Sequence, residues 1–111
     1  MTKVLVVDDD RAALGIRKLI LERAGHEVST AASLEEARAA ARPDVAVLDL
    51  RIPEIQDGLA LIREFRARGV RIVVLCGNRA DLEGREEASM VDLVLEKPVR
   101  SEVLLSALAN G

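Results

Sequence analysis

The residues best able to do chemistry in this chain stand after short apolar runs. Three carboxylates follow residues 4–7, one follows 45–48, a thiol follows 72–75 and an ammonium group comes shortly after 93–95. These side chains are Asp8, Asp9, Asp10, Asp49, Cys76 and Lys97. Crowded carboxylates repel one another and favour a cation, and an oxygen-rich site with net negative charge suits Mg²⁺ or Mn²⁺. Such a metal beside a lysine would attract a phosphoryl group.

Single positions in this set also have simpler structural interpretations. An aspartate after a strand is often the N-cap of the next helix, and Asp10 fits that role better than a metal role. Lys97 precedes a proline, where a lysine is usually a solvated loop residue. Cys76 is either a small buried hydrophobe or a thiol whose pKa the nearby Lys97 lowers. The combination is more informative, because three separate strand ends contribute complementary chemistry.

The apolar runs predict five β-strands. The runs at 4–7, 45–48 and 72–75 are apolar at every position, as in strands that are covered on both faces of a parallel sheet. A weaker run at 28–31 and a short one at 93–95 complete the set. The strands therefore predict a largely buried sheet.

Helical patterns lie between these strands. Gly25 is a natural end for the first helix, Ser33 and Glu36 form a capping box before the second, and Ser101 is a plausible N-cap of the last. The segment 80–90 is polar and has only a weak apolar pattern. The predicted helices cover residues 11–24, 34–41, 58–68, 80–90 and 101–109.

Strict alternation of strands and helices predicts a doubly wound α/β domain with right-handed crossovers and helices on both faces of the sheet. In an open parallel sheet, ligands bind beyond the carboxyl ends of the strands. The reactive residues listed above all stand at such ends. The sequence therefore predicts one site at one edge of one sheet.

Composition narrows the possible functions. The 111 residues include 16 basic and 19 acidic ones, a net charge of −3, and half of the chain is hydrophobic. We therefore expect a single domain over residues 1–111, without a nucleic-acid or membrane surface. The one cysteine and the direct start of a strand in residues 1–7 suggest a cytoplasmic protein without a signal peptide. Phe65 is the single aromatic residue, so a stacking platform for bases is not expected.

Four short motifs resemble the receiver domain of two-component response regulators, including the chemotaxis regulators. They are ordered and spaced much as in that family, and the resemblance covers essentially the whole chain. It implies a flavodoxin-like sheet of five parallel strands in the order 2-1-3-4-5. The motifs are Val7-Asp8-Asp9, Leu48-Asp49-Leu50-Arg51-Ile52-Pro53, Asp57-Gly58 and Lys97-Pro98.

The resemblance implies a role for each matching residue. Asp49 corresponds to the phosphoacceptor, a carboxylate nucleophile that forms an aspartyl phosphate. Asp9 corresponds to the direct ligand of Mg²⁺ or Mn²⁺, with Asp8 acting largely through water, and Asp49 and the backbone carbonyl of Arg51 complete the set. Lys97 corresponds to the lysine that pairs with the phosphoryl oxygens, and the family has a cis peptide bond directly after it.

The sequence also departs from the family pattern. Cys76 occupies the switch position of the usual Thr or Ser, and Val94 replaces the switch aromatic of the last strand. Val99 stands where an aromatic is frequent, and Asp57-Gly58 lie one residue further from Asp49 than usual. A thiol is a weaker hydrogen-bond donor than a hydroxyl. We therefore expect phosphorylation to be retained and its readout to be weakened.

The resemblance implies a phosphoacceptor that receives its phosphoryl group from a histidine kinase or phosphotransfer protein. It would act on an output protein or a missing effector domain, and it would be no enzyme beyond self-directed phosphotransfer and autodephosphorylation. A homodimer could form through the face of residues 80–90, 93–95 and 101–109. The alternative is a degenerate receiver, which binds proteins without phosphorylation.

Two enzyme or nucleotide-binding hypotheses fit less well. Aspartyl-phosphate enzymes similar to the haloacid dehalogenase superfamily need a second Asp two residues after the nucleophile, where this chain has Arg51. A nucleotide-binding Rossmann protein needs a glycine-rich turn after the first strand. Here three aspartates, residues 8–10, stand at that point and would repel a pyrophosphate.

Overall fold

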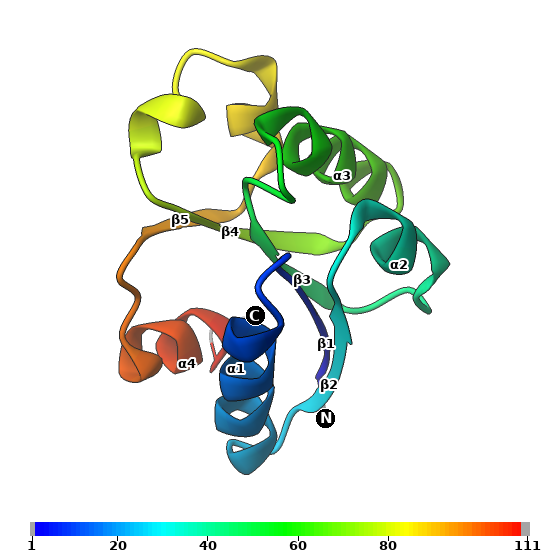
Figure 1. Ribbon diagram of the computed structural model, residues 1–111, viewed down its shortest axis with the longest axis vertical. Helices are drawn as coiled ribbons and strands as arrows, with labels where there is room; N and C mark the ends of the chain where they lie inside the picture. The colour runs from blue at the N-terminus through cyan, green and yellow to red at the C-terminus, as the bar shows by residue number, and fades with distance from the viewer. Residues whose placement is uncertain (1, 110–111) are drawn as a thin grey trace.

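The computed structural model describes residues 2–109 and contains a parallel sheet of five strands (Figure 1). The strand order is β2-β1-β3-β4-β5, and all four pairings are parallel, which confirms the predicted flavodoxin-like order 2-1-3-4-5. The strands are β1 (Lys3–Val7), β2 (Glu27–Ala31), β3 (Val45–Asp49), β4 (Arg71–Cys76) and β5 (Leu93–Glu96).

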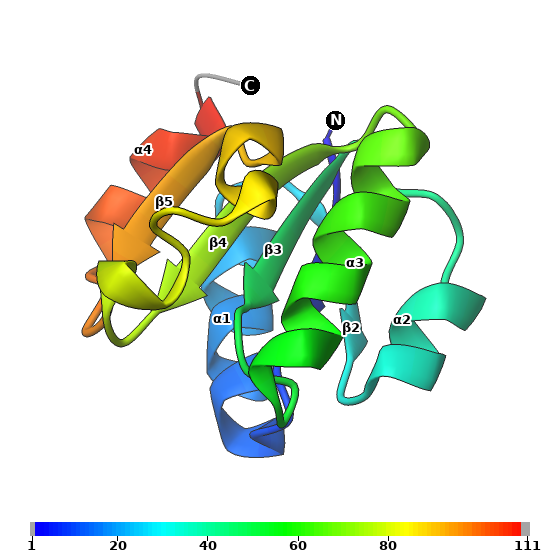
Figure 2. The same ribbon diagram turned by 90° about the horizontal axis from the view of Figure 1, so that it is seen from above.

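Helices cover both faces of the sheet, as predicted. Figures 1 and 2 show α1 and α4 on one face and α2 and α3 on the other. The helices are α1 (Arg11–Arg23), α2 (Leu34–Ala39), α3 (Ile55–Ala67) and α4 (Ser101–Ala109). Within residues 2–109, no helix has the length and apolar content needed to cross a membrane.

The three central strands are buried because their residues supply both cores. Val4 and Val6 of β1 pack into the cluster under α1 and α4, whereas Leu5 and Val7 pack into the cluster under α2 and α3. Successive side chains of a strand point to opposite faces, so a strand covered on both sides must be apolar at every position. This explains why the unbroken apolar runs predicted the central strands correctly.

The first two helices begin at the predicted capping residues. The Asp10 carboxylate accepts hydrogen bonds from the backbone N–H groups of Ala12 and Ala13, which confirms Asp10 as the N-cap of α1. Ser33 Oγ accepts from the Glu36 N–H at 3.1 Å. The reciprocal bond differs from the predicted capping box, because the Glu36 carboxylate accepts from the N–H of residue 32, one residue before the cap.

The helix predicted over residues 80–90 is wrong. Two short 3-10 turns occupy this region, η1 (Arg79–Asp81) and η2 (Glu86–Met90), and they are separated by Gly84 with φ +76°. That backbone conformation lies outside the right-handed helical region, and glycine adopts it without steric cost. The segment buries only Leu82 and Glu87, so no apolar stripe favours a continuous helix. The predicted homodimer face therefore lacks its first helix.

Two predicted helix boundaries and one predicted cap also differ. Helix α2 ends at Ala39, two residues before the predicted end. Helix α3 begins at Ile55 rather than at residue 58, because the Asp57 carboxylate accepts the Glu54 N–H and so stabilises an earlier first turn. Ser101 is the first residue of α4 and not its N-cap, so the carbonyl of Arg100 accepts the first helical hydrogen bonds.

Candidate functional site

The carboxyl ends of β1, β3, β4 and β5 meet at one edge of the sheet and bring the predicted reactive side chains together. Carboxylate oxygens of Asp8, Asp9 and Asp49 all lie within 4.8 Å of one another. A cleft of ≈450 Å³ opens beside this acidic cluster. Its walls include Asp49, Arg51, Cys76, Asn78, Asp81 and Lys97.

Asp49 lies at the end of β3 and is held through both carboxylate oxygens. Lys97 Nζ lies 2.5 Å from Asp49 Oδ2. The backbone N–H of Arg51 donates to Asp49 Oδ1 at 3.2 Å. The Lys97–Pro98 peptide bond is cis, as the resemblance implied. The predicted nucleophile and the predicted phosphoryl-binding ammonium group are therefore in direct contact.

Burial raises the pKa of the Asp49 carboxyl above its ordinary value. Lys97 opposes this shift by donating a hydrogen bond and by its positive charge, while the neighbouring charge of Asp8 adds to it. An anion in this place therefore costs free energy in the folded protein until further positive charge arrives.

Asp8 is more deeply buried, at 2% exposure, but its carboxylate is fully partnered. Its Oδ1 accepts the backbone N–H of Asp10 at 3.0 Å, and its Oδ2 lies 2.5 Å from Arg17 Nη1. Burial opposes ionisation of Asp8, but these hydrogen bonds and the charge of Arg17 outweigh it and lower its pKa. Asp8 is therefore an anion that is compensated within the protein.

Arg17 is the residue of the acidic cluster's surroundings that sequence reasoning missed, and Asp81 in the cleft wall was not predicted either. It lies on α1 between Leu14 and Leu21, which are both buried, at the i+3 spacing from Leu14 that continues the apolar stripe. Its side chain is 18% exposed. A charged residue on the core-facing stripe of a helix was the available signal, because such a residue needs a buried partner.

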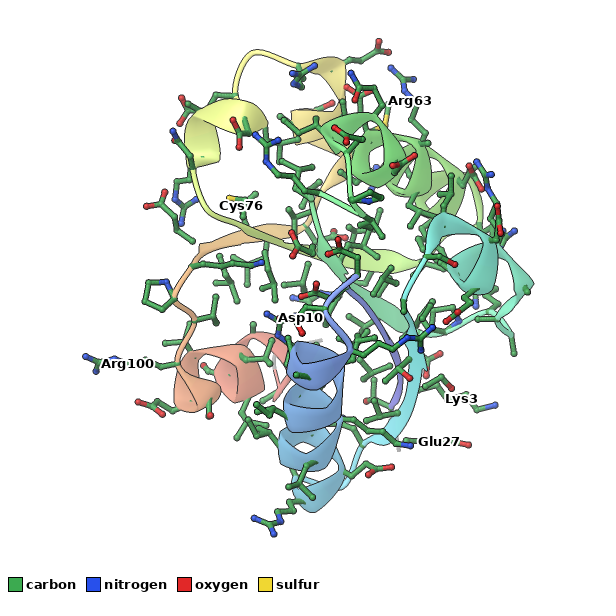
Figure 3. All side chains as sticks on the ribbon, viewed as in Figure 1. Lys3, Asp10, Glu27, Arg63, Cys76 and Arg100 are labelled. Carbon is green, nitrogen blue, oxygen red and sulfur yellow. The ribbon has the colours of Figure 1, made fainter. Side chains whose placement is uncertain are left out.

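Cys76 ends β4 and is 2% exposed. Asp10 and Cys76, both labelled in Figure 3, mark the start of α1 and the end of β4. Burial raises the pKa of the Cys76 thiol, and Arg79, not Lys97, supplies the opposing positive charge. The buried position and the raised pKa favour the interpretation of Cys76 as a small hydrophobe, packed in the core under α2 and α3, over that of a reactive thiol.

Val94 is half-buried on β5, and an arginine binds its backbone. Arg79 Nη2 of η1 donates to the Val94 carbonyl at 3.1 Å, and Arg79 Nε lies 3.6 Å from Glu96 Oε1. Across the cleft, Arg51 Nη2 lies 3.3 Å from Asp81 Oδ2. The η1 turn is therefore tied to β5 on one side and to the loop after β3 on the other.

The donor set fits a small divalent cation. Mg²⁺ prefers oxygen ligands, usually one or two carboxylates together with water molecules. The Asp9 side chain is exposed, and none of the residues from 2 to 109 donates a hydrogen bond to its carboxylate. Asp9 is therefore free to act as a ligand, beside the partnered oxygens of Asp8 and Asp49. Asp10 is not in the cluster, in agreement with its role as an N-cap.

The known proteins whose sequences resemble this chain are regulatory proteins. The model of the response regulator receiver domain family matches residues 4–109. Transcriptional regulatory protein AfsQ1 of Streptomyces coelicolor is 35% identical over 111 aligned residues, which cover 94% of this chain and 48% of AfsQ1. The alkaline phosphatase synthesis regulator PhoP of Bacillus subtilis is 34% identical over 84 residues, 73% of this chain and 35% of PhoP. The chain thus spans between a third and a half of these curated relatives.

Solved receiver structures have the same fold. A receiver domain protein from Clostridium thermocellum has a TM-score of 0.85 at 28% identity, over 99% of this chain and 93% of that one. The response regulator TrrA of Thermotoga maritima, in complex with Mg²⁺-BeF, has a TM-score of 0.87 at 25% identity, over 99% and 98%.

The chain belongs to the response regulator receiver domain family. Members of this family are regulatory phosphoacceptors of two-component signal transduction and not classical enzymes. Phosphorylation on an aspartate and Mg²⁺ binding in an acidic pocket are general properties of the family.

Proposed function

We propose that this domain accepts a phosphoryl group on Asp49. The observation that carries the proposal is the contact of Asp49 with Lys97 at 2.5 Å inside a cluster of three carboxylates that opens onto a cleft. A carboxylate beside a lysine, two further carboxylates and an open cleft suit a site that receives a phosphoryl group next to a cation.

The donor would be a phosphohistidine of a histidine kinase or phosphotransfer protein. A carboxylate oxygen of Asp49 forms a bond to phosphorus as the bond between phosphorus and the imidazole nitrogen breaks, and that nitrogen takes up a proton. The product is an acyl phosphate on Asp49. Lys97 would pair with the new phosphoryl oxygens as a point charge.

Asp8, Asp9, Asp49 and the Arg51 carbonyl would hold the Mg²⁺ or Mn²⁺ ion. When bound, the ion supplies positive charge that lowers the repulsion between the anionic carboxylate and the phosphoryl oxygens. The chain's own contribution is to hold these oxygen donors together at fixed strand ends.

The output is proposed to be a weakened, phosphorylation-dependent change in the segment 79–96. The Cys76 thiol donates a weaker and longer hydrogen bond than a hydroxyl, and Val94 has no ring that could move. The domain would act in the cytoplasm on an output protein or an effector domain. If it forms a homodimer, the half-buried strand β5 and helix α4 offer the face for it.

A specific observation favours the alternative of a phosphorylation-independent binding module. Lys97 and Arg17 already neutralise two of the three carboxylates, and ion pairs hold η1 in place. Such a domain would present one fixed surface with or without a phosphoryl group.

Phosphoryl uptake decides between these functions. We expect the protein, incubated with Mg²⁺ and acetyl phosphate, to gain the mass of one phosphoryl group, and Asp49→Asn to gain none. Asp10→Asn is the matched control, because it removes a neighbouring carboxylate while asparagine preserves the helix cap. Uptake that persists in Asp49→Asn removes Asp49 from its role, and no uptake by the unchanged protein favours the binding module.

A further inference from the structure

Arg17 is a cation built into the edge of the acidic cluster. Its guanidinium lies 2.5 Å from Asp8 Oδ2, and its side chain is only 18% exposed. The backbone N–H of Asp10 donates a hydrogen bond to the other carboxylate oxygen of Asp8. Both oxygens of this carboxylate are therefore already occupied by donors of the protein.

The charges of the site are nearly balanced as a result. Asp8, Asp9 and Asp49 carry three negative charges, and Lys97 and Arg17 carry two positive ones, so the net charge is one negative. The guanidinium remains charged at any ordinary pH, so its effect is permanent. The Arg17 guanidinium repels a divalent cation that approaches the cluster. Both carboxylate oxygens of Asp8 already accept hydrogen bonds from the protein.

We propose that Arg17 is a positioning residue that holds Asp8 in place without metal and weakens Mg²⁺ binding at the acidic cluster. This inference rests on the proposed function, since it concerns the same cluster. Its consequence is a domain that is stable without metal and that binds Mg²⁺ only at high concentration. The availability of Mg²⁺ would then limit how much of the protein can be phosphorylated.

The test is a Mg²⁺ titration of the full chain, followed by amide NMR. In Arg17→Gln, the Kd for Mg²⁺ should fall roughly tenfold, because one positive charge close to the ion has been removed. Arg17→Lys keeps the charge and should stay closer to the unchanged protein. Arg23→Gln is the matched control, since it removes an exposed arginine from the last turn of the same helix and should change the Kd less than about twofold.

The outcomes separate this inference from the proposed function. An unchanged or higher Kd in a folded Arg17→Gln, with Mg²⁺ binding intact in the parent protein, overturns the inference alone. No Mg²⁺-dependent shifts at residues 8, 9 and 49 in either protein overturn the proposed metal site and the inference with it.

A second measurement covers a folding defect. If Arg17→Gln unfolds without metal, Mg²⁺ should restore its fold, because the ion then replaces the missing partner of Asp8. Failure to fold at the Mg²⁺ concentration that saturates the parent protein contradicts the inference.

Discussion

Asp8 and Asp49 belong to one acidic cluster, but their pKa values move in opposite directions because their surroundings differ. Burial raises the pKa of Asp49 and is only partly offset by Lys97, whereas Arg17 and a backbone N–H lower the pKa of the more buried Asp8. Asp8 therefore has the character of a fixed structural charge. Asp49 has the character of a group that gains from added positive charge, which suits a phosphoacceptor beside a metal site.

The lowered pKa of Asp8 predicts how stability depends on pH. The pKa of the Asp8 carboxyl is 3.8 in the unfolded chain and lower in the folded protein. The ionised carboxyl therefore stabilises the fold above pH 3.8, and this contribution is lost as the pH falls through the pKa of the folded state. Thermal unfolding of the metal-free protein, followed by circular dichroism from pH 7 to below 3, should show this loss.

The variant Asp8→Asn isolates the contribution of that carboxyl. It should be less stable at neutral pH by about 3 kcal/mol, since it leaves the Arg17 charge without its partner. Its stability should also fall less steeply in acid. Asp44→Asn is a control at the opposite end of the sheet. If the stability of Asp8→Asn falls as steeply in acid as that of the parent protein, the lowered pKa of Asp8 does not contribute as described.

Replacement of Cys76 tests whether its thiol weakens the readout of phosphorylation. Cys76→Thr places a strong donor at the end of β4, so beryllofluoride with Mg²⁺ should shift the amides of residues 79–90 roughly twofold more than in the parent protein. Cys76→Val is the matched control, because it has the shape of threonine without the hydroxyl. Equal shifts in all three proteins would show that the thiol does not limit the readout.

Sequence reasoning predicted the acidic cluster but missed Arg17. The reason is that the two parts of the site are specified in different ways. The aspartates could be found because each follows an apolar run, which places it at a strand end. Arg17, the partner of Asp8, lies nine residues further along the chain on α1. The two side chains meet because of the way α1 packs on the sheet. The local pattern marks Arg17 as a charge on the core-facing stripe of α1, but which carboxylate it binds depends on how the helix packs on the sheet.

Helix α3 shows how one glycine sets the distance between an element and the site. A Cβ on Gly58 would overlap the backbone carbonyl oxygen of Leu50, in the loop that directly follows Asp49. The close approach of helix and loop therefore requires glycine. This gives a structural reason for the Asp57-Gly58 motif, despite its shift by one residue.

Gly58→Ala should lower the free energy of unfolding by about 1–3 kcal/mol, the usual cost of overpacking a site that cannot relax freely. Gly15→Ala is the matched control, because a Cβ there meets nothing within 4 Å and alanine favours the helix by about 0.8–1 kcal/mol. Urea unfolding followed by circular dichroism suits a chain without Trp or Tyr. Equal stabilisation in both variants would contradict the close approach of α3.

The segment of η1 and η2 could not be predicted from its own residues. Arg63, labelled on α3 in Figure 3, binds Glu87 at 2.7 Å and Glu86 at 3.2 Å, and Arg51 binds Asp81. These partners are 23 to 30 residues apart in the chain. These contacts join residues that are far apart in the chain, whereas a sequence pattern records only local relations.

At the scale of the whole molecule, the sequence pattern was sufficient for the fold class, a doubly wound parallel sheet. Three unbroken apolar runs separated by helical patterns leave few arrangements other than a parallel sheet covered on both faces, and the right-handed crossover rule removes most of the rest. The strand order itself came from the resemblance. What the whole fold adds is the meeting of four strand ends around one cleft.

Asp49 is proposed to accept a phosphoryl group in a site that binds Mg²⁺. The most direct test adds beryllofluoride, a phosphoryl mimic, to the full chain with and without Mg²⁺ and follows the amide NMR spectrum, with Asp49→Asn as the control. We expect Mg²⁺-dependent shifts at Asp9, Asp49, Cys76 and Lys97 and weaker shifts in residues 79–96, all absent in Asp49→Asn. No response at any Mg²⁺ concentration that leaves the protein folded, or the same response in Asp49→Asn, would contradict the proposal.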